Sequence, residues 1–149
     1  MKNLFFTTLF LATTFALSAQ KSITHKTLQE SLNDKYCTGL FKTTDGTVLD
    51  VASETSLNGY FNILDWLYGR VAGLQVYTTR SGTKIPVMRG QVSTIYIDEI
   101  PVNANFLNAL SIHDIAMIKV IKTPFYGGFN GGGGAIAIYT TQPEEDEEE

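Results

Sequence analysis

The chain has 149 residues, of which 44% are hydrophobic and 17% are charged, and its formal net charge is −4. This length provides one globular domain with a core of its own. Residues 144–149 are all acidic and contribute −6, so the rest of the chain carries +2, the difference between −4 and −6. A nearly neutral domain without a basic stripe excludes a nucleic-acid binder that relies on electrostatic attraction.

The first twenty residues have the organisation of a secretory signal peptide. Lys2 precedes an apolar run at residues 4–17, and small residues follow at Ser18 and Ala19. We therefore predict export with cleavage between about residues 18 and 20, and the alternative is an uncleaved membrane anchor. Cys37 is the single cysteine, so no internal disulfide is expected, and we predict that Cys37 is a buried apolar side chain.

The mature chain divides into three stretches by composition. Residues 21–45 are polar and weakly periodic, which predicts a partly ordered lead-in with a helical turn or two at residues 27–32, capped by Thr24 or Thr27. Residues 46–141 carry the alternating and periodic apolar patterns of a folded domain. The acidic residues within 142–149 predict a disordered tail.

The clearest predicted element is a long amphipathic helix that starts at Asn58 and ends at Gly73. Apolar side chains recur at helical spacing on one face of it, namely Tyr60, Ile63, Leu64, Leu67, Tyr68 and Val71. A second, short helix is predicted at residues 105–110.

Short strands surround these helices. Alternation and β-branched residues predict strands at residues 48–51, 74–79, 85–89, 94–98, 116–121 and 135–141. Pro86 lacks an amide donor and is expected at a sheet edge or a strand start. The predicted fold class is α+β, a small mixed β-sheet packed by one long and one short helix.

Motifs that suggest catalysis or metal binding have simpler interpretations. The glycine-rich segment 127–134 leads into a strand and not into a helix, so it does not form a phosphate-binding loop. His113 and Asp114 are consecutive, which favours a turn or a helix cap over a catalytic relay with Ser111. Asp98 and Glu99 fall in a turn. We predict no enzymatic activity, no catalytic residue, no metal site and no cofactor.

Five segments, in order, resemble the plug domain of TonB-dependent receptors of the Bacteroidetes type. They are residues 62–76 (NILDWLYGRVAGLQV), 86–90 (PVMRG), 95–102 (IYIDEIPV), 114–122 (DIAMIKVIK) and 126–138 (YGGFNGGGGAIAI). They are similar to the family's "GRVAG" helix end, "IRG" strand, "LDGVPV" hairpin, "IEVLKG" strand and "YGSRGANGVI" loop. Two departures stand out, because Glu99 replaces a usual glycine and Thr123 replaces the glycine after the family's lysine.

The resemblance implies a stand-alone plug-like domain that acts as a non-enzymatic protein-interaction or gating module of outer-membrane transport. A receptor barrel of ~22 strands needs roughly 220 residues, so we expect this chain to lack one. The implied partner is an envelope protein, such as an outer-membrane β-barrel encoded separately, and the implied location is the periplasm or the outer membrane. Arg89, Arg70 and Lys122 are the predicted partner-binding residues.

Two alternatives to this function stay open. The first is a periplasmic domain that binds a small ligand, a ferric chelate or a glycan, through loop residues Ser81, Gly82, Gly127, Gly128, Phe129 and Asn130. The second is an inactive remnant of a receptor.

Overall fold

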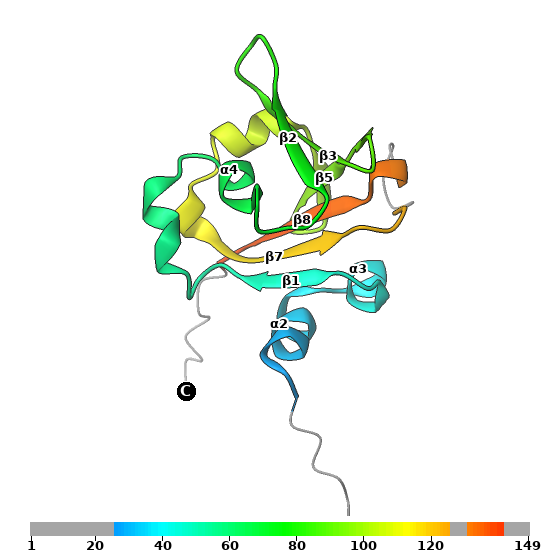
Figure 1. The fold of residues 1–149 in the computed structure, drawn as a ribbon. Coiled ribbons are helices and arrows are strands. Elements are labelled where there is room, and N and C mark those ends of the chain that lie inside the picture. Colours follow the sequence, from blue (N-terminus) through cyan, green and yellow to red (C-terminus); the bar gives the residue numbers. More distant parts are fainter. Residues whose placement is uncertain (1–25, 126–130, 142–149) are drawn as a thin grey trace, which may run out of the picture.

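The computed structural model describes residues 26–125 and 131–141, which form two β-sheets with short helices on either side (Figure 1). The larger sheet has the strand order β1 (Thr47–Asp50), β7 (Ile115–Ile121), β8 (Ala135–Thr140), β5 (Thr94–Ile97) and β6 (Ile100–Val102). The smaller sheet contains β2 (Leu74–Thr78), β3 (Lys84–Met88) and β4 (Gln91–Val92). The predicted α+β class, with open sheets packed by helices, is confirmed.

Strands β7 and β8 form the centre of the larger sheet. All seven residues of β7 are buried, and so are the first five of β8, as expected for strands covered on both faces. The β5–β8 pair is parallel, with Ile95 opposite Ile136, whereas the β7–β8, β1–β7 and β5–β6 pairs are antiparallel. The sheet is therefore mixed, as predicted.

Each face of the larger sheet has its own hydrophobic core, because successive side chains of a strand point to opposite faces. Ile118 and Val120 belong to a core completed by helix α4 (Ile63–Leu67) and the smaller sheet. Met117 and Ile121 belong to a second core completed by residues of the predicted lead-in, including Cys37 and Phe41. Cys37 is buried, as predicted, and burial raises the pKa of its thiol.

The lead-in forms two helices on the second face, α2 (Leu28–Tyr36) and α3 (Gly39–Thr43). Thr27 caps α2, as predicted, and a capping box links it to Glu30: the Thr27 hydroxyl accepts from the Glu30 amide, and the Glu30 carboxylate accepts from the Thr27 amide. The sequence analysis did not foresee that this segment completes a core.

The predicted long helix is wrong in its length and its start. Helix α4 has five residues and is capped by Asn62, whose side-chain oxygen accepts a hydrogen bond from the Leu64 amide at 2.9 Å. Asn58 instead lies in the 3-10 helix η2 (Thr55–Gly59). Gly69, with φ of 85°, ends the helical run before Gly73 is reached.

The shortening of α4 also divides the predicted apolar face. Ile63, Leu64 and Leu67 are buried as expected, whereas Tyr60 and Tyr68 lie outside the helix and are exposed. The second predicted helix is a 3-10 helix, η3 (Ala104–Asn108).

The expected edge position of Pro86 is also wrong, because Pro86 lies in the middle of β3, the central strand of the smaller sheet. Strand β4 pairs only with Val87 and Met88. The Pro86 carbonyl accepts a hydrogen bond from the Ser93 amide at 2.9 Å. The paired residues of β3 and β4 thus end at Val87, and residue 86 contributes only its carbonyl to this side of the sheet. An amide donor is not needed at residue 86, so proline is tolerated there.

Candidate functional site

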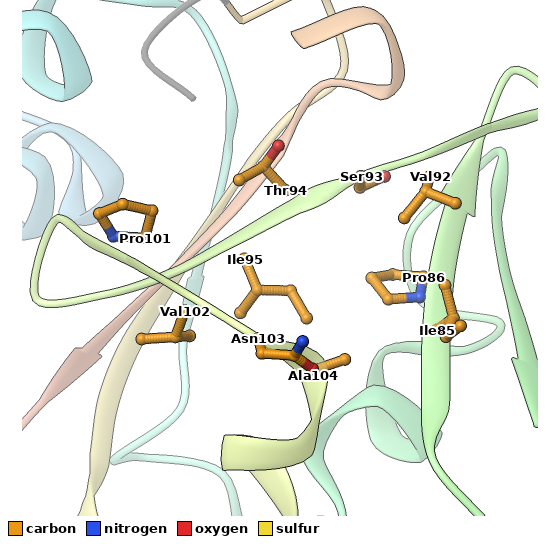
Figure 2. A pocket seen from close by; sticks show the side chains of 10 residues that line it. All are labelled: Ile85, Pro86, Val92, Ser93, Thr94, Ile95, Pro101, Val102, Asn103 and Ala104. Atoms are coloured by element: carbon orange, nitrogen blue, oxygen red, sulfur yellow. The ribbon is translucent and has the colours of Figure 1, made fainter. Parts of the chain in front are cut away.

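A cleft of about 440 Å³ lies between the two sheets, at the point where the chain passes from β4 to β5 (Figure 2). Its volume is within the range of small-molecule sites. The lining residues come from β3, β4, β5, β6 and the start of η3: Ile85, Pro86, Val92, Ser93, Thr94, Ile95, Pro101, Val102, Asn103 and Ala104. We refer to it as the inter-sheet cleft.

The lining of the inter-sheet cleft is mainly aliphatic and contains no charged side chain. In Figure 2, Ile85 and Pro86 on β3 face Ile95 and Val102 on the larger sheet. The Ser93 hydroxyl already donates to the Gly133 carbonyl at 2.8 Å. The cleft is therefore suited to an apolar, uncharged group and offers little for a ferric chelate or a glycan to bind.

A second, smaller cavity of about 240 Å³ lies beside two basic residues that the sequence analysis selected. It is lined by Ala72, Gly73, Met88, Arg89 and Lys122, and we call it the cationic recess. Arg89 lies in the turn between β3 and β4, and Lys122 directly follows β7. The fold therefore brings together Arg89 and Lys122, which are 33 positions apart in the sequence (122 minus 89).

Backbone geometry holds Arg89 at the tip of its turn. Arg89 and Gly90 both have positive φ, 55° and 76°, which is typical of a two-residue hairpin turn whose twist matches that of its strands. Within residues 26–125 and 131–141, neither Arg89 nor Lys122 has an acidic partner within 4.0 Å. The recess thus presents positive charge that the described part of the domain leaves unpaired.

Arg70, the third predicted partner-binding residue, does not line the recess and is engaged elsewhere. Its guanidinium lies over the Trp66 ring, 4.6 Å from the centroid, and donates to the Trp66 carbonyl at 2.8 Å and to the Ser56 hydroxyl at 3.2 Å. The Tyr60 ring lies 5.8 Å away. These contacts give Arg70 a structural role in covering the end of α4.

The predicted ligand loops are described only in part. Ser81 and Gly82 form the tip of the hairpin between β2 and β3, where Gly82 has φ of 82°. The Ser81 hydroxyl contacts those of Thr79 and Thr83, and the Thr83 hydroxyl donates to the Asn105 side chain at 2.6 Å. Gly127, Gly128, Phe129 and Asn130 lie outside the described residues.

Of the motifs predicted to lie in turns or caps, Asp98 and Glu99 lie in a turn, whereas His113 and Asp114 lie within a 3-10 helix. Ser111 caps the 3-10 helix η4 (Ile112–Asp114), where its hydroxyl accepts from the His113 amide at 3.3 Å. Asp98 and Glu99 form the β5–β6 turn with φ of 47° and 67°. Within the described ranges, no three His, Cys, Asp or Glu side chains are grouped so as to hold a metal ion.

The inter-sheet cleft is the feature that sequence reasoning missed. The cleft residues on β3 and β5 are short runs of ordinary strand residues, partly or fully buried in the structure, so their sequence carries no signal of a cavity. The separation of the strands into two sheets creates the cleft, and this separation depends on long-range pairing.

No family model and no curated protein matches this chain. Solved structures do match. The RagAB peptide importer in the "closed-closed" state has a TM-score of 0.56 and 21% identity, over 70% of this chain and 13% of that one. A mutant of the ferric enterobactin receptor PfeA from Pseudomonas aeruginosa has a TM-score of 0.53 and 18% identity, over 65% and 17% of the two chains. The ferric yersiniabactin uptake receptor FyuA from Yersinia pestis has a TM-score of 0.51 and 25% identity, over 67% and 17%.

These neighbours are TonB-dependent receptors, and the part of this chain that matches them has a plug-like fold. The chain spans only 13% to 17% of their length. No helix within residues 26–125 and 131–141 is both long and apolar enough to cross a membrane.

Proposed function

We propose that this chain is a non-enzymatic plug-like module of outer-membrane transport that acts by binding or gating another envelope protein. The observation that carries the proposal is the cationic recess on a plug-like fold. Arg89 and Lys122 line one cavity and have no described acidic partner. Unpaired charge at a preformed surface favours a partner of opposite charge, because electrostatic complementarity adds specificity and speeds association.

The proposed partner is an outer-membrane β-barrel whose wall presents Asp or Glu side chains to the recess. The solved neighbours with this fold are a peptide importer, a ferric enterobactin receptor and a ferric yersiniabactin uptake receptor, and this similarity supports a role in transport. Export, followed by residence in the periplasm or at the outer membrane, is part of the proposal and follows from the predicted signal peptide. Arg70 is expected to contribute less, because its guanidinium already has acceptors within the domain.

Crosslinking in intact cells, followed by identification of the attached protein, tests this function. We expect Arg89→Glu and Lys122→Glu each to reduce recovery of the partner at least tenfold, since each reverses one charge at the recess. Arg80→Glu is the matched control, because Arg80 is an exposed arginine in the β2–β3 hairpin turn and does not line the recess. Equal recovery by all four proteins would count against the recess as the binding surface.

A second candidate function, a periplasmic domain that binds a small ligand, is favoured by the inter-sheet cleft alone. The uncharged aliphatic lining points to an apolar ligand in place of the ferric chelate or glycan that the sequence suggested. Thermal unfolding in the presence of apolar compounds distinguishes the two functions. Stabilisation that is abolished by Val92→Trp, which adds bulk at an exposed position of the cleft lining, supports the ligand site. Stabilisation of both proteins alike would mean that the compounds bind elsewhere.

A further inference from the structure

Strand β2 forms one edge of the smaller sheet, and its outer side has no neighbouring strand among the described residues. The Thr79 amide donates to the Thr83 carbonyl at 2.8 Å, so residue 79 bonds toward β3. In an antiparallel pair, successive residues bond alternately toward the neighbouring strand and away from it. Val76 and Thr78 therefore direct their backbone groups away from β3. Pro86, which lies opposite Val76, likewise uses its carbonyl on the β4 side.

These outward backbone groups are unpaired in the part of the chain that the structure describes. Neither the amide nor the carbonyl of Val76 or Thr78 has a hydrogen-bond partner there. The Leu74 carbonyl points the same way, while the Leu74 amide donates to the Val71 carbonyl at 3.1 Å. The edge thus offers the amides of residues 76 and 78 and the carbonyls of residues 74, 76 and 78. Such a row of free donors and acceptors is one that another β-strand can continue.

The other sheet edges within the described residues are protected. Pro101, which lacks an amide donor, is the middle residue of β6, and helix α2 packs against β1. The backbone of Gly133 lies against β4, where an added Cβ would be 2.3 Å from the Val92 carbonyl oxygen. Prolines, charged side chains and covering segments keep sheet edges from pairing. Strand β2, with the sequence LQVYT, contains no proline and no charged residue, so its own sequence does not prevent pairing.

The β2 edge is complementary to itself. If two copies of β2 lie antiparallel with Val76 opposite Val76, each Val76 amide faces the Val76 carbonyl of the other copy. Each Thr78 amide then faces the Leu74 carbonyl of the other copy, which gives about four hydrogen bonds in all. On the exposed face of the strand, Gln75 of one copy lies opposite Tyr77 of the other. Tyr77 is 55% exposed, so this pairing also removes aromatic surface from water.

We propose that a second copy of this chain adds to the β2 edge, antiparallel and centred on Val76, so that the two three-stranded sheets continue into one sheet of six strands. The pairing has closed two-fold symmetry, which is the commonest symmetry of homo-oligomers. It brings no like charges together, because β2 is uncharged. Figure 1 shows the tip of the β2–β3 hairpin standing clear of the helices, so this end of the edge is accessible. The inference does not depend on the cationic recess or on the proposed partner.

Sedimentation velocity of the whole protein over a range of concentrations tests this pairing. We expect a monomer at about 1 µM and a species of twice the monomer mass at about 200 µM. The expected Kd is on the order of 10–100 µM, because a single pair of strands buries less area than a standard interface. A monomer at every concentration would overturn the inference, and a different protein would then have to supply any strand that covers this edge.

Charged side chains at the two exposed positions of β2 test the register. In the double variant Gln75→Lys with Tyr77→Lys, like charges lie directly opposite each other across the dimer, and Kd should rise by at least about tenfold. The double variant Gln75→Lys with Tyr77→Glu is the matched control. It changes the same positions but brings opposite charges together, so Kd should stay within about threefold of the wild type. Both positions are exposed, so neither variant should disturb the fold.

A second pair of variants tests the outward amide of residue 78. Thr78→Pro removes an amide that has no partner within the described residues, whereas Thr78→Ala removes the hydroxyl and keeps this amide. Thr78→Pro should raise Kd by at least about fivefold, and Thr78→Ala should leave it unchanged. The charged variants decide the outcome if Thr78→Pro does not fold. Equal association of the two members of either pair would show that the copies meet at another surface, and would refute the inference.

Discussion

The plug-domain family that this chain resembles usually has a glycine in place of Glu99. Replacement of Glu99 by glycine relieves backbone strain in the β5–β6 turn and removes the hydrogen bonds of the Glu99 carboxylate, so the two effects on stability oppose each other. Glu99 has φ of 67° in the β5–β6 turn, where a residue other than glycine costs about 1 kcal/mol. Its carboxylate holds the lead-in, because it accepts hydrogen bonds from the Thr38 amide at 2.6 Å, from the Thr38 hydroxyl and from the buried Tyr139 hydroxyl at 3.2 Å.

The contacts should outweigh the backbone strain. A hydrogen bond to a charged group contributes roughly 1.5–3 kcal/mol, and exposure of Thr38 reduces this to about 1 kcal/mol for each of its two bonds. Leaving the Tyr139 hydroxyl buried without an acceptor costs about 1 kcal/mol more. The total of about 3 kcal/mol, less about 1 kcal/mol of relieved strain, predicts that Glu99→Gly lowers the free energy of unfolding by about 2 kcal/mol.

Urea denaturation measures this difference. At an m-value of about 2 kcal/mol/M, the midpoint should fall by ~1 M. Thr38→Val removes the hydroxyl bond and keeps the amide bond, so it should cost about 1 kcal/mol in the wild-type protein. It should cost almost nothing in the Glu99→Gly background, where the hydroxyl bond is already lost. A Glu99→Gly protein as stable as the wild type, or additive effects of the two substitutions, would refute the idea that this carboxylate fastens the lead-in.

Three further predictions concern the backbone, the core and pH. Gly134→Ala should destabilise the protein by more than about 3 kcal/mol, because the added Cβ would lie 2.2 Å from the Ile121 carbonyl oxygen and the backbone has φ of 72°. Gly82 has a similar φ but open space around it, so Gly82→Ala should cost only about 1 kcal/mol. Equal losses in thermal unfolding would contradict the difference. The Tyr96 hydroxyl is buried and has no partner within the described residues, so Tyr96→Phe should leave stability unchanged or raise it by about 1 kcal/mol; a loss measured in urea would indicate a missed partner. Burial raises the pKa of Cys37 above its ordinary 9.0, so the unfolded chain releases this proton first and stability falls as pH rises through 9. Between pH 8 and pH 10, the wild type should therefore lose more stability than Cys37→Ala, and parallel losses would argue against this linkage.

The pattern of neighbouring residues correctly predicted those strands, caps and turns that form from residues close together in the chain. The buried runs at residues 116–121 and 135–141 predicted β7 and β8, and the β5 prediction was equally close. Thr27 was correctly predicted to cap α2. The turn at Asp98 and Glu99 was also predicted, although the partners that hold it, Thr38, Tyr139 and Thr140, were not. A strand or a cap forms from neighbours in the chain, and such neighbours are visible in the sequence.

Other features depended on contacts between distant segments. Helical spacing continued from Tyr60 to Val71, yet the helix stops at Leu67 because Asn62 caps it late and Gly69 ends it early. The Asn33–Lys119 hydrogen bond joins residues 86 positions apart, so nothing near Lys119 in the sequence indicated how a buried lysine is satisfied.

The sequence by itself determined the class of fold, the order of strands along the chain and the positions of most turns, because periodicity and turn chemistry act over a few residues. Only the tertiary structure decided that the strands separate into two sheets, with a cleft between them and a recess where Arg89 meets Lys122. The physical reason is that side-chain alternation fixes which face of a strand is buried and leaves open which strand lies beside it. The parallel β5–β8 pairing joins segments about forty residues apart, and no local pattern encodes that choice.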